Sequence, residues 1–157
     1  MYIIDTNAVV DFYDRYYCPD VFETLSRDVN AIAAQNKVFL IRQVMEELER
    51  NLDTNSLLEF NKLKLQFLTE NQSVQRHVAD ITQFLNQSIR PKLVANFLKG
   101  ADIYLIAQAI VHGKKIITNE RGRYNTNSKI YIPAVARNYN IETLELVDFF
   151  RHEGLCY

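Results

Sequence analysis

The sequence is poor in the residues that build tight turns and anion-binding loops, since its 157 residues include only four glycines and three prolines. This scarcity favours a helix-rich chain with few tight turns. Neither of the glycine-rich phosphate-binding patterns, GxxxxGK[ST] or GxGxxG, occurs. The GxSxG turn that presents a serine nucleophile is absent as well. A functional site must therefore be sought among other residue types.

The sequence also lacks a cysteine pair, a charge excess and a long apolar run. Its two cysteines, Cys18 and Cys156, form no CxxC motif, so we expect two separate thiols rather than a disulfide or a zinc site. The 18 basic and 19 acidic residues nearly balance, so no global positive field indicates a nucleic-acid partner. No signal peptide is recognisable, and no apolar run approaches the roughly 20 residues that span a bilayer. We expect a cytoplasmic protein without membrane contact.

Short apolar runs alternate with segments of helical periodicity along the chain. The apolar runs predict short buried strands at residues 1–4, 38–41 and 115–118, and a further strand at 141–144. The longer periodic segments predict helices at residues 8–16, 19–35, 42–50, 101–112 and 146–153. Strands that alternate with helices predict an α/β layer fold with a parallel sheet.

Residues 51–97 differ from the rest because they are polar and helical in pattern throughout. Leucine, valine and phenylalanine recur there at helical spacing, and no strand is expected. We interpret the segment as an insertion of two or three helices. It can shape substrate entry, form a dimer contact or bind a partner, and the pattern does not choose among these roles.

Four acidic positions follow predicted strands or begin predicted helices. Asp5 ends the first strand, Glu120 lies just beyond the strand that ends at Thr118, and Asp102 begins a helix. Glu46 or Glu47 follows the second strand. In open α/β sheets, sites form beyond the carboxyl ends of the strands. These segments are therefore predicted to converge.

Each acid alone also has an ordinary structural explanation. Asp5 can cap the next helix, and Asp102 can complement a helix dipole. The acidic run at residues 46–50 can be a solvated helix face, and Glu120 an ordinary loop residue. Only the joint pattern favours a carboxylate site over these explanations.

The four acidic segments resemble, in order and spacing, the four motifs of PIN-domain ribonucleases: residues 3–7, 44–48, 100–107 and 116–120. Residues 14–22 and 129–133 further resemble a subgroup of short prokaryotic PIN-like proteins that is regarded as toxin-like, beside the VapC-type toxins. The resemblance spans nearly the whole chain. It implies a three-layer α/β/α PIN-like fold with a short parallel sheet, in a single domain of residues 1–157 that carries the helical insertion at about 51–97.

The resemblance also implies a set of site residues. The catalytic acids would be, by position, Asp5, Glu47, Asp102 and Glu120. Glu47 is preferred to Glu46 because the family's acid immediately precedes a leucine. Asp5, Asp102 and Glu120 would bind metal, with Asn7 and Thr118 as supporting polar residues. Many PIN domains have aspartate where this chain has Glu120, so Glu120 is expected to act through a water or to hold a second metal loosely.

Clustered carboxylates suit the hydrolysis of a phosphodiester. Several carboxylates in one place repel each other, and a hard divalent cation relieves this repulsion by taking oxygen ligands. Mg²⁺ or Mn²⁺ would lower the pKa of a bound water and neutralise charge at the phosphate. We expect Asp5 and Asp102 to be direct ligands, and Glu47 to contact metal through water or to orient the nucleophile.

The residues after Glu120 are candidates for RNA binding: Arg121, Arg123, Tyr124 and Lys129. Arginine and lysine can hold phosphates, and a tyrosine can stack on an unpaired base. The alternative is a solvated loop without a ligand.

We therefore expect a metal-dependent endoribonuclease, the toxin of a type II toxin–antitoxin module, which implies an RNA substrate, a cognate antitoxin and a homodimer. Two alternatives remain: a PIN nuclease of RNA processing or decay, and a non-catalytic PIN-like interaction module. The retention of acids at all four motif positions disfavours the second. A haloacid-dehalogenase-like phosphatase is disfavoured because residues 5–7 lack the second aspartate of a DxD motif.

Overall fold

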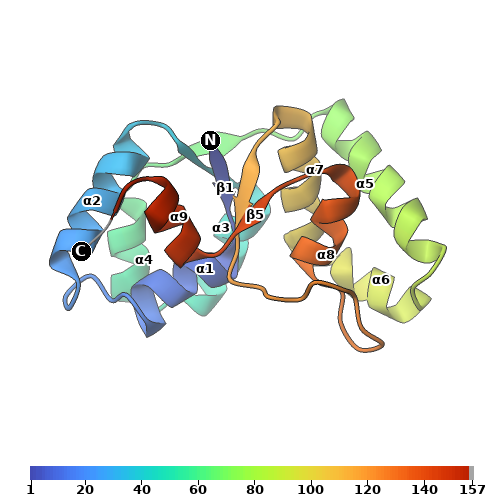
Figure 1. The fold of residues 1–157 in the computed structure, drawn as a ribbon, viewed down its shortest axis with the longest axis horizontal. Coiled ribbons are helices and arrows are strands. Elements are labelled where there is room, and N and C mark those ends of the chain that lie inside the picture. The colour runs from blue at the N-terminus through green and yellow to red at the C-terminus, as the bar shows by residue number, and fades with distance from the viewer. Residues whose placement is uncertain (156–157) are drawn as a thin grey trace.

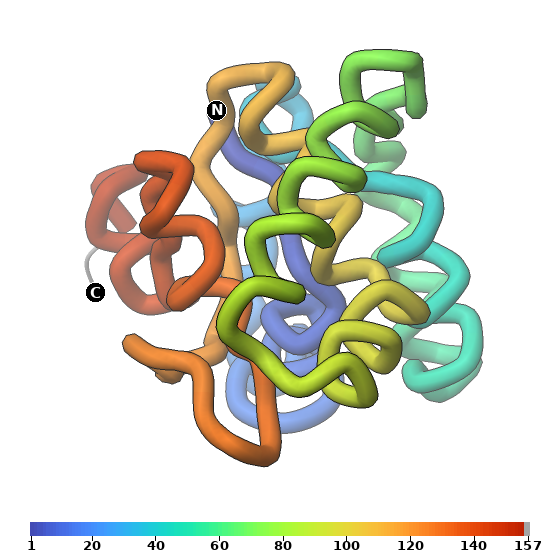
Figure 2. Tube along the Cα trace, turned by 90° about the vertical axis from the view of Figure 1, so that its right-hand side faces the viewer, coloured from blue at the N-terminus to red at the C-terminus, as the bar shows by residue number. Residues whose placement is uncertain are grey.

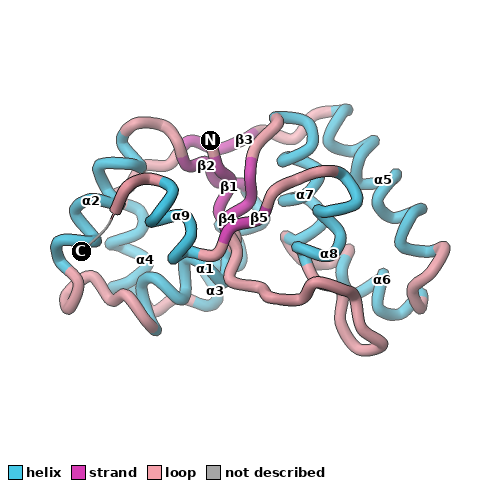
Figure 3. Tube along the Cα trace, in the orientation of Figure 1, coloured by secondary structure: helices cyan, strands magenta, loops and turns pink. Residues whose placement is uncertain are grey.

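The computed structural model of the chain describes residues 1–155 and shows a five-stranded, entirely parallel sheet in the order β3-β2-β1-β4-β5 (Figure 3). Its strands are β1 (Tyr2–Ile4), β2 (Val38–Ile41), β3 (Gln66–Leu68), β4 (Lys115–Ile117) and β5 (Thr143–Leu144). Cys18 is a free thiol, and Cys156 lies outside the described residues. The predicted parallel α/β fold is confirmed.

Helices cover the sheet on both sides and complete three layers (Figure 1). One side carries α2 (Glu23–Ala34), α4 (Thr54–Asn61) and α9 (Leu146–His152). The other side carries α5 (Gln72–Asn86), α6 (Pro91–Phe97), α7 (Asp102–His112) and α8 (Ile132–Ala136). The view turned by 90° shows α5 as the outermost helix on its side (Figure 2). Apolar strands that are covered on both faces are typical of parallel sheets.

The segment 51–97 contains the predicted trio of helices, α4, α5 and α6, but the expectation that it has no strand was wrong. β3 lies within it and pairs in parallel with β2, with Leu40 opposite Phe67. Three residues are too few to show a period of two, and Gln66 and Phe67 are exposed at the sheet edge. The pairing that makes this segment a strand is long-range and leaves no local pattern.

Several predicted boundaries shifted in the folded chain. The helix expected from residue 19 begins at Glu23. The helix expected at 8–16 is α1 (Thr6–Val10) followed by a π-helical turn, Asp11–Arg15. The last strand, expected at 141–144, is confined to residues 143–144. Helix ends depend on which backbone groups find partners, and periodicity does not report this.

The central strands position the functional edge. Ile4 of β1 lies opposite Ile117 of β4, so both strands end at the same level. The N–H of Asp5 donates to the carbonyl of Ile117 at 2.9 Å. The chain then enters α1 after β1, and α3 (Arg42–Asn51) after β2. Among the described residues, no single helix is long and apolar enough to cross a membrane, and α6 with α7 passes that test only as a pair bent by 69°.

Candidate active site

Three of the four predicted acids line one hollow at the carboxyl edge of the sheet. Its volume is about 410 Å³, and its lining residues are Asp5, Thr6, Asn7, Val10, Arg15, Glu47, Asn51 and Asp102. Asp5 follows β1, Glu47 lies on α3 and Asp102 begins α7. The fold therefore brings together residues that are far apart in the sequence, as the strand-end argument predicted.

Asp5 is a buried carboxyl group with a strongly raised pKa. Only 2% of the residue is exposed, and burial, followed by the charge of Asp102, raises its pKa to about 8. The hydroxyl of Thr118 donates to its Oδ2 at 2.8 Å and opposes this rise. Asp5 occupies the N-cap position of α1 but makes no side-chain cap hydrogen bond. The capping explanation therefore does not account for this residue.

Asp102 lies in the first turn of α7, where the helix dipole favours a negative charge. Its surroundings nevertheless oppose ionisation. Burial, and then the charges of Glu120 and Glu47, raise its pKa to about 7. Burial and the nearby acids disfavour the charged form of Asp102 that would stabilise the helix dipole. The dipole explanation is therefore insufficient for this residue.

Glu47 joins the two segments that carry the aspartates. Its Oε2 accepts a hydrogen bond from the hydroxyl of Thr6 at 2.6 Å, and its Oε1 accepts from the N–H of Ala101 at 2.9 Å. The start of α1 and the start of α7 are thereby tied to one carboxylate. Glu46 instead pairs with Arg42 at 2.8 Å on the exposed face of α3. Of the two adjacent glutamates, Glu47 is the one placed at the hollow.

Glu120 does not line the hollow of the other three acids. Its Oε2 accepts from the N–H of Ile132 at 2.8 Å, and its Oε1 pairs with Lys129 Nζ at 2.6 Å. It lines a separate hollow of about 350 Å³ together with Thr118 and Arg121. Its charge still contributes to the raised pKa values of Asp5 and Asp102. Its role as a metal ligand stays a prediction.

Of the two predicted supporting residues, Thr118 bonds Asp5 directly and Asn7 bonds Thr118. The Nδ2 of Asn7 donates to the Thr118 hydroxyl at 3.3 Å, and its Oδ1 accepts from the N–H of Asn119 at 2.9 Å. Asn119 in turn donates to Asp11 Oδ2 at 2.7 Å and accepts from the N–H of Leu146 at 2.9 Å. Asn7 lines the acidic hollow, and the role of both residues as supports of a metal site stays a prediction.

The sequence reasoning missed Asn119 and Asp11. Asp11 is 7% exposed although it is charged. A signal for it exists in the sequence, because Asp11 interrupts an apolar run between Val10 and Phe12. Asn119 has no such signal beyond its place between two motif residues. Both became visible through contacts that cross more than a hundred positions of the chain.

None of the predicted RNA-binding residues lines the acidic hollow, and two of them are paired with acids. Arg121 binds Glu145 at 2.9 Å, and Lys129 binds Glu120. Tyr124 is 75% exposed. Arg123 lines the hollow of Glu120. RNA binding by these four residues stays a prediction.

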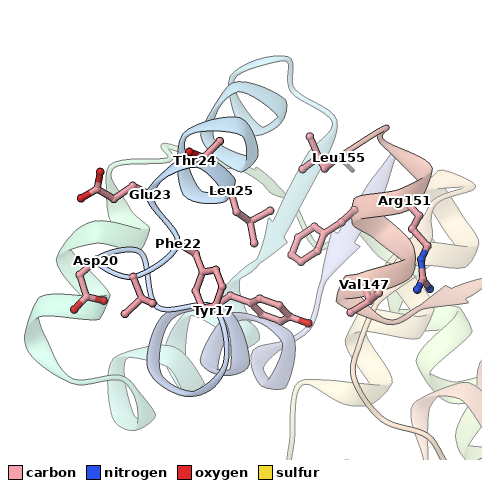
Figure 4. A pocket seen from close by; sticks show the side chains of 11 residues that line it. Tyr17, Asp20, Phe22, Glu23, Thr24, Leu25, Val147, Arg151 and Leu155 are labelled. Carbon is pink, nitrogen blue, oxygen red and sulfur yellow. The ribbon is translucent and has the colours of Figure 1, made fainter. Parts of the chain in front are cut away.

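A larger hollow, of about 910 Å³, lies elsewhere on the molecule (Figure 4). Its lining includes the apolar side chains of Phe22, Leu25 and Phe150 and the ring of Tyr17, together with the acids Asp20 and Glu23. Figure 4 shows Tyr17, Phe22 and Leu25 at the hollow. None of the predicted acids lines it. We place the chemistry at the smaller hollow because the crowded buried carboxylates are there.

The acids of the smaller hollow fit a hard divalent cation. Among residues 1–155, no group of three or more acidic, histidine or cysteine side chains is arranged to ligate one ion. Mg²⁺, however, is often bound through only one or two carboxylates and keeps several waters. Asp5 and Asp102 provide two such groups, and their raised pKa values reflect the burial and repulsion that a cation would relieve.

Comparison with known proteins agrees with this architecture. The chain matches, over residues 2–157, the family described as a domain of unknown function, DUF4411. No curated protein matches it in sequence. A chain in the crystal structure of VapBC2 from Rickettsia felis, bound to a DNA fragment from their promoter, has a TM-score of 0.57 and 16% identity. The likeness covers 92% of this chain and 97% of that one, and at this identity it shows the fold alone. The protein thus has a PIN-like fold and belongs to the DUF4411 family.

Proposed function

We propose that this protein is a metal-dependent endoribonuclease that hydrolyses RNA phosphodiester bonds. The observation that carries the proposal is that Asp5 and Asp102 line one hollow at the carboxyl edge of the sheet, where burial and the charges of neighbouring acids raise both pKa values. Such crowding opposes folding and is common at sites that bind cations or transfer protons. The type of reaction, hydrolysis of RNA, is inferred from the resemblance of four sequence motifs to those of PIN-domain ribonucleases.

Asp5 and Asp102 would hold Mg²⁺ or Mn²⁺, which supplies an activated water and neutralises charge on the phosphate. The chain's own residues prepare this site. Thr118 orients the carboxylate of Asp5 through its hydroxyl. Glu47 fixes the start of α7, and therefore Asp102, relative to the start of α1. A rigid arrangement of this kind lowers the reorganisation that the reaction requires.

We further propose that the protein is the toxin of a type II toxin–antitoxin module, that it acts in the cytoplasm as a homodimer, and that it has a cognate antitoxin. The support is the resemblance of residues 14–22 and 129–133 to toxin-like PIN proteins, together with a structural neighbour that belongs to a VapBC2 assembly. A PIN nuclease of RNA processing or decay is the alternative. Induced expression distinguishes the two, because a toxin arrests growth and the Asp5→Asn variant of that toxin does not.

The ribonuclease activity is tested by the Asp5→Asn substitution. We expect RNA cleavage in Mg²⁺ or Mn²⁺ to be abolished, because the amide is a weaker metal ligand and carries no charge. The fold should be retained, as judged by circular dichroism. Glu46→Gln is the matched control, because it also replaces a carboxylate by an amide but does so on the exposed face of α3. This variant should cleave RNA as the wild type does. Full activity of Asp5→Asn, or activity in excess EDTA, contradicts the proposal.

A further inference from the structure

A second hollow adjoins the acidic one, and an ion pair separates them. Arg15 lines the acidic hollow, and Asp11 lines the neighbouring hollow of about 260 Å³. The two side chains bind each other at 3.1 Å. The remaining residues of the neighbouring hollow are Tyr16, Tyr17, Asn119, Arg121, Glu145 and Val147. We call this hollow the Tyr16 hollow.

The π-helical turn at the end of α1 creates this arrangement. The N–H of Tyr16 bonds the carbonyl of Asp11 at 2.8 Å, five residues back, which widens the last turn. Such turns are rare and frequently occur at functional sites. Arg15 is thereby placed at the acidic hollow, and Tyr16 follows it directly at the Tyr16 hollow.

Tyr16 is a large aromatic residue that the core does not use. It is 64% exposed and makes no ring contact with the described residues. Its neighbours behave differently, because Tyr13 is buried and Tyr17 packs against Phe12 and Phe150. An exposed tyrosine beside a hollow offers a free face on which a planar group can stack.

The two hollows differ in how their acids are partnered. In the Tyr16 hollow both acids form ion pairs, Glu145 with Arg121 of the same lining and Asp11 with Arg15 of the adjoining hollow. In the acidic hollow, Arg15 is the one basic residue in the lining that the structure describes. A guanidinium has five N–H donors, and Asp11 accepts from one of its nitrogens. The other donors of Arg15 are suited to a phosphate.

We propose that the Tyr16 hollow is a nucleotide subsite for an unpaired RNA base next to the scissile phosphate. The base stacks on Tyr16, and Arg15 contacts the phosphate between the two hollows. Single-stranded RNA is commonly bound by such combinations of aromatic faces and cations. The inference rests on the proposed ribonuclease function, and it names the residues that would select and hold the substrate.

The test uses a short single-stranded RNA in which 2-aminopurine replaces adenine, because stacking quenches the fluorescence of this base. Binding is measured in the Asp5→Asn background, where hydrolysis is not expected. We expect the added Tyr16→Ala substitution to weaken binding about tenfold or more and to abolish the quenching. Tyr16→Phe should keep both, since it retains the ring. Phe67→Ala, which removes a 52% exposed aromatic on β3, is the control.

Arg15 has a separate signature. Arg15→Gln should weaken RNA binding about tenfold, while the quenching at saturation stays, because the base subsite is intact. Arg27→Gln, which alters an exposed arginine of α2 paired with Asp28, should bind as the parent does. Unchanged affinity and quenching in Tyr16→Ala overturn the subsite, as does a parent protein that binds no RNA.

Cleavage by the wild-type protein separates this inference from the proposed function. If the wild-type protein cleaves RNA and Tyr16→Ala has the same KM as the wild type, the nuclease function is supported and the subsite is wrong. If the fluorescence quenching depends on Tyr16 but the wild-type protein cleaves no RNA, the base subsite is supported and the nuclease function is wrong. In a functional nuclease, Tyr16→Ala should raise KM without changing Mn²⁺ affinity.

Discussion

At the scale of single residues, Thr118 shows how a small group prepares a charged one. Its hydroxyl donates to Asp5 Oδ2 at 2.8 Å and accepts from the N–H of Glu120 at 3.2 Å. The first bond stabilises the ionised form of Asp5, against the burial and the charges that raise its pKa. Because the proposed metal binding would require that ionised form, we expect the affinity for metal to depend on this hydroxyl.

The Thr118→Val substitution tests this dependence, since valine has nearly the same shape and no hydroxyl. A hydrogen bond to a charged group contributes about 1.5–3 kcal/mol. We therefore expect Mn²⁺ to bind about tenfold more weakly in calorimetry at neutral pH. Thr118→Ser retains the hydroxyl and should restore most of the affinity. Equal affinities of wild type and Thr118→Val would show that this bond does not tune Asp5.

At the scale of elements, α7 links the site to the core. It begins with Asp102 in the acidic hollow and is buried along most of its length, including Ile103, Leu105 and Ile106. It ends at Gly113, whose backbone is left-handed with φ of 58°. The buried face sets the position of the helix, and the helix sets the position of Asp102. The two ends of α7 therefore differ: one places Asp102 in the acidic hollow, and the other ends the helix at a left-handed glycine.

Gly113→Ala tests the left-handed end in isolation. An added Cβ meets no atom within 4 Å, so only the backbone conformation opposes the change. We expect the free energy of unfolding to fall by about 1 kcal/mol, because alanine is disfavoured in the left-handed region. The free energy of unfolding should fall by less in Gly113→Asn, since asparagine tolerates the left-handed region better than alanine does. Urea denaturation measures both, and Mn²⁺ affinity should not change because Asp102 lies at the other end.

At the scale of the whole molecule, the buried acids of the hollow lower the stability of the metal-free fold at neutral pH. Asp5 and Asp102 have pKa values of about 8 and about 7 in the folded state, against 3.8 for an unperturbed aspartate. At pH values between 3.8 and about 8, the folded state therefore binds more protons than the unfolded state. Its stability therefore falls as pH rises. The stability that protonation of these two carboxyls contributes to the folded state is fully present below pH 3.8, and it is lost as the pH rises through about 8.

The corresponding experiment is urea denaturation of metal-free protein between about pH 5 and pH 8. Wild-type protein should lose stability with rising pH relative to Asp5→Asn, which lacks the titrating carboxyl. Saturating Mn²⁺ should restore more stability at the upper end of this range than at the lower end, because binding displaces protons. Parallel pH profiles for the wild type and Asp5→Asn would show that Asp5 ionises normally.

Local patterns in the sequence determined the parallel α/β class, strands β1, β2 and β4, and the placement of Asp5 and Asp102 at one edge. These features follow from short apolar runs and from the geometry of parallel strands, so neighbouring residues suffice to predict them. The resemblance to PIN domains also identified Thr118 and Asn7, which contact the acidic site. The three-layer architecture was implied by the same resemblance.

The tertiary structure alone decided the rest, because long-range contacts decided it. β3 is a strand only through its pairing with β2. Glu47 bonds Thr6 and Ala101, while Glu120 bonds Lys129 and the N–H of Ile132. The link from Asn119 to Asp11 sets the ion pair of Asp11 with Arg15 between the two hollows. The direction in which a side chain points depends on its partners in space, and periodicity along the chain does not report them.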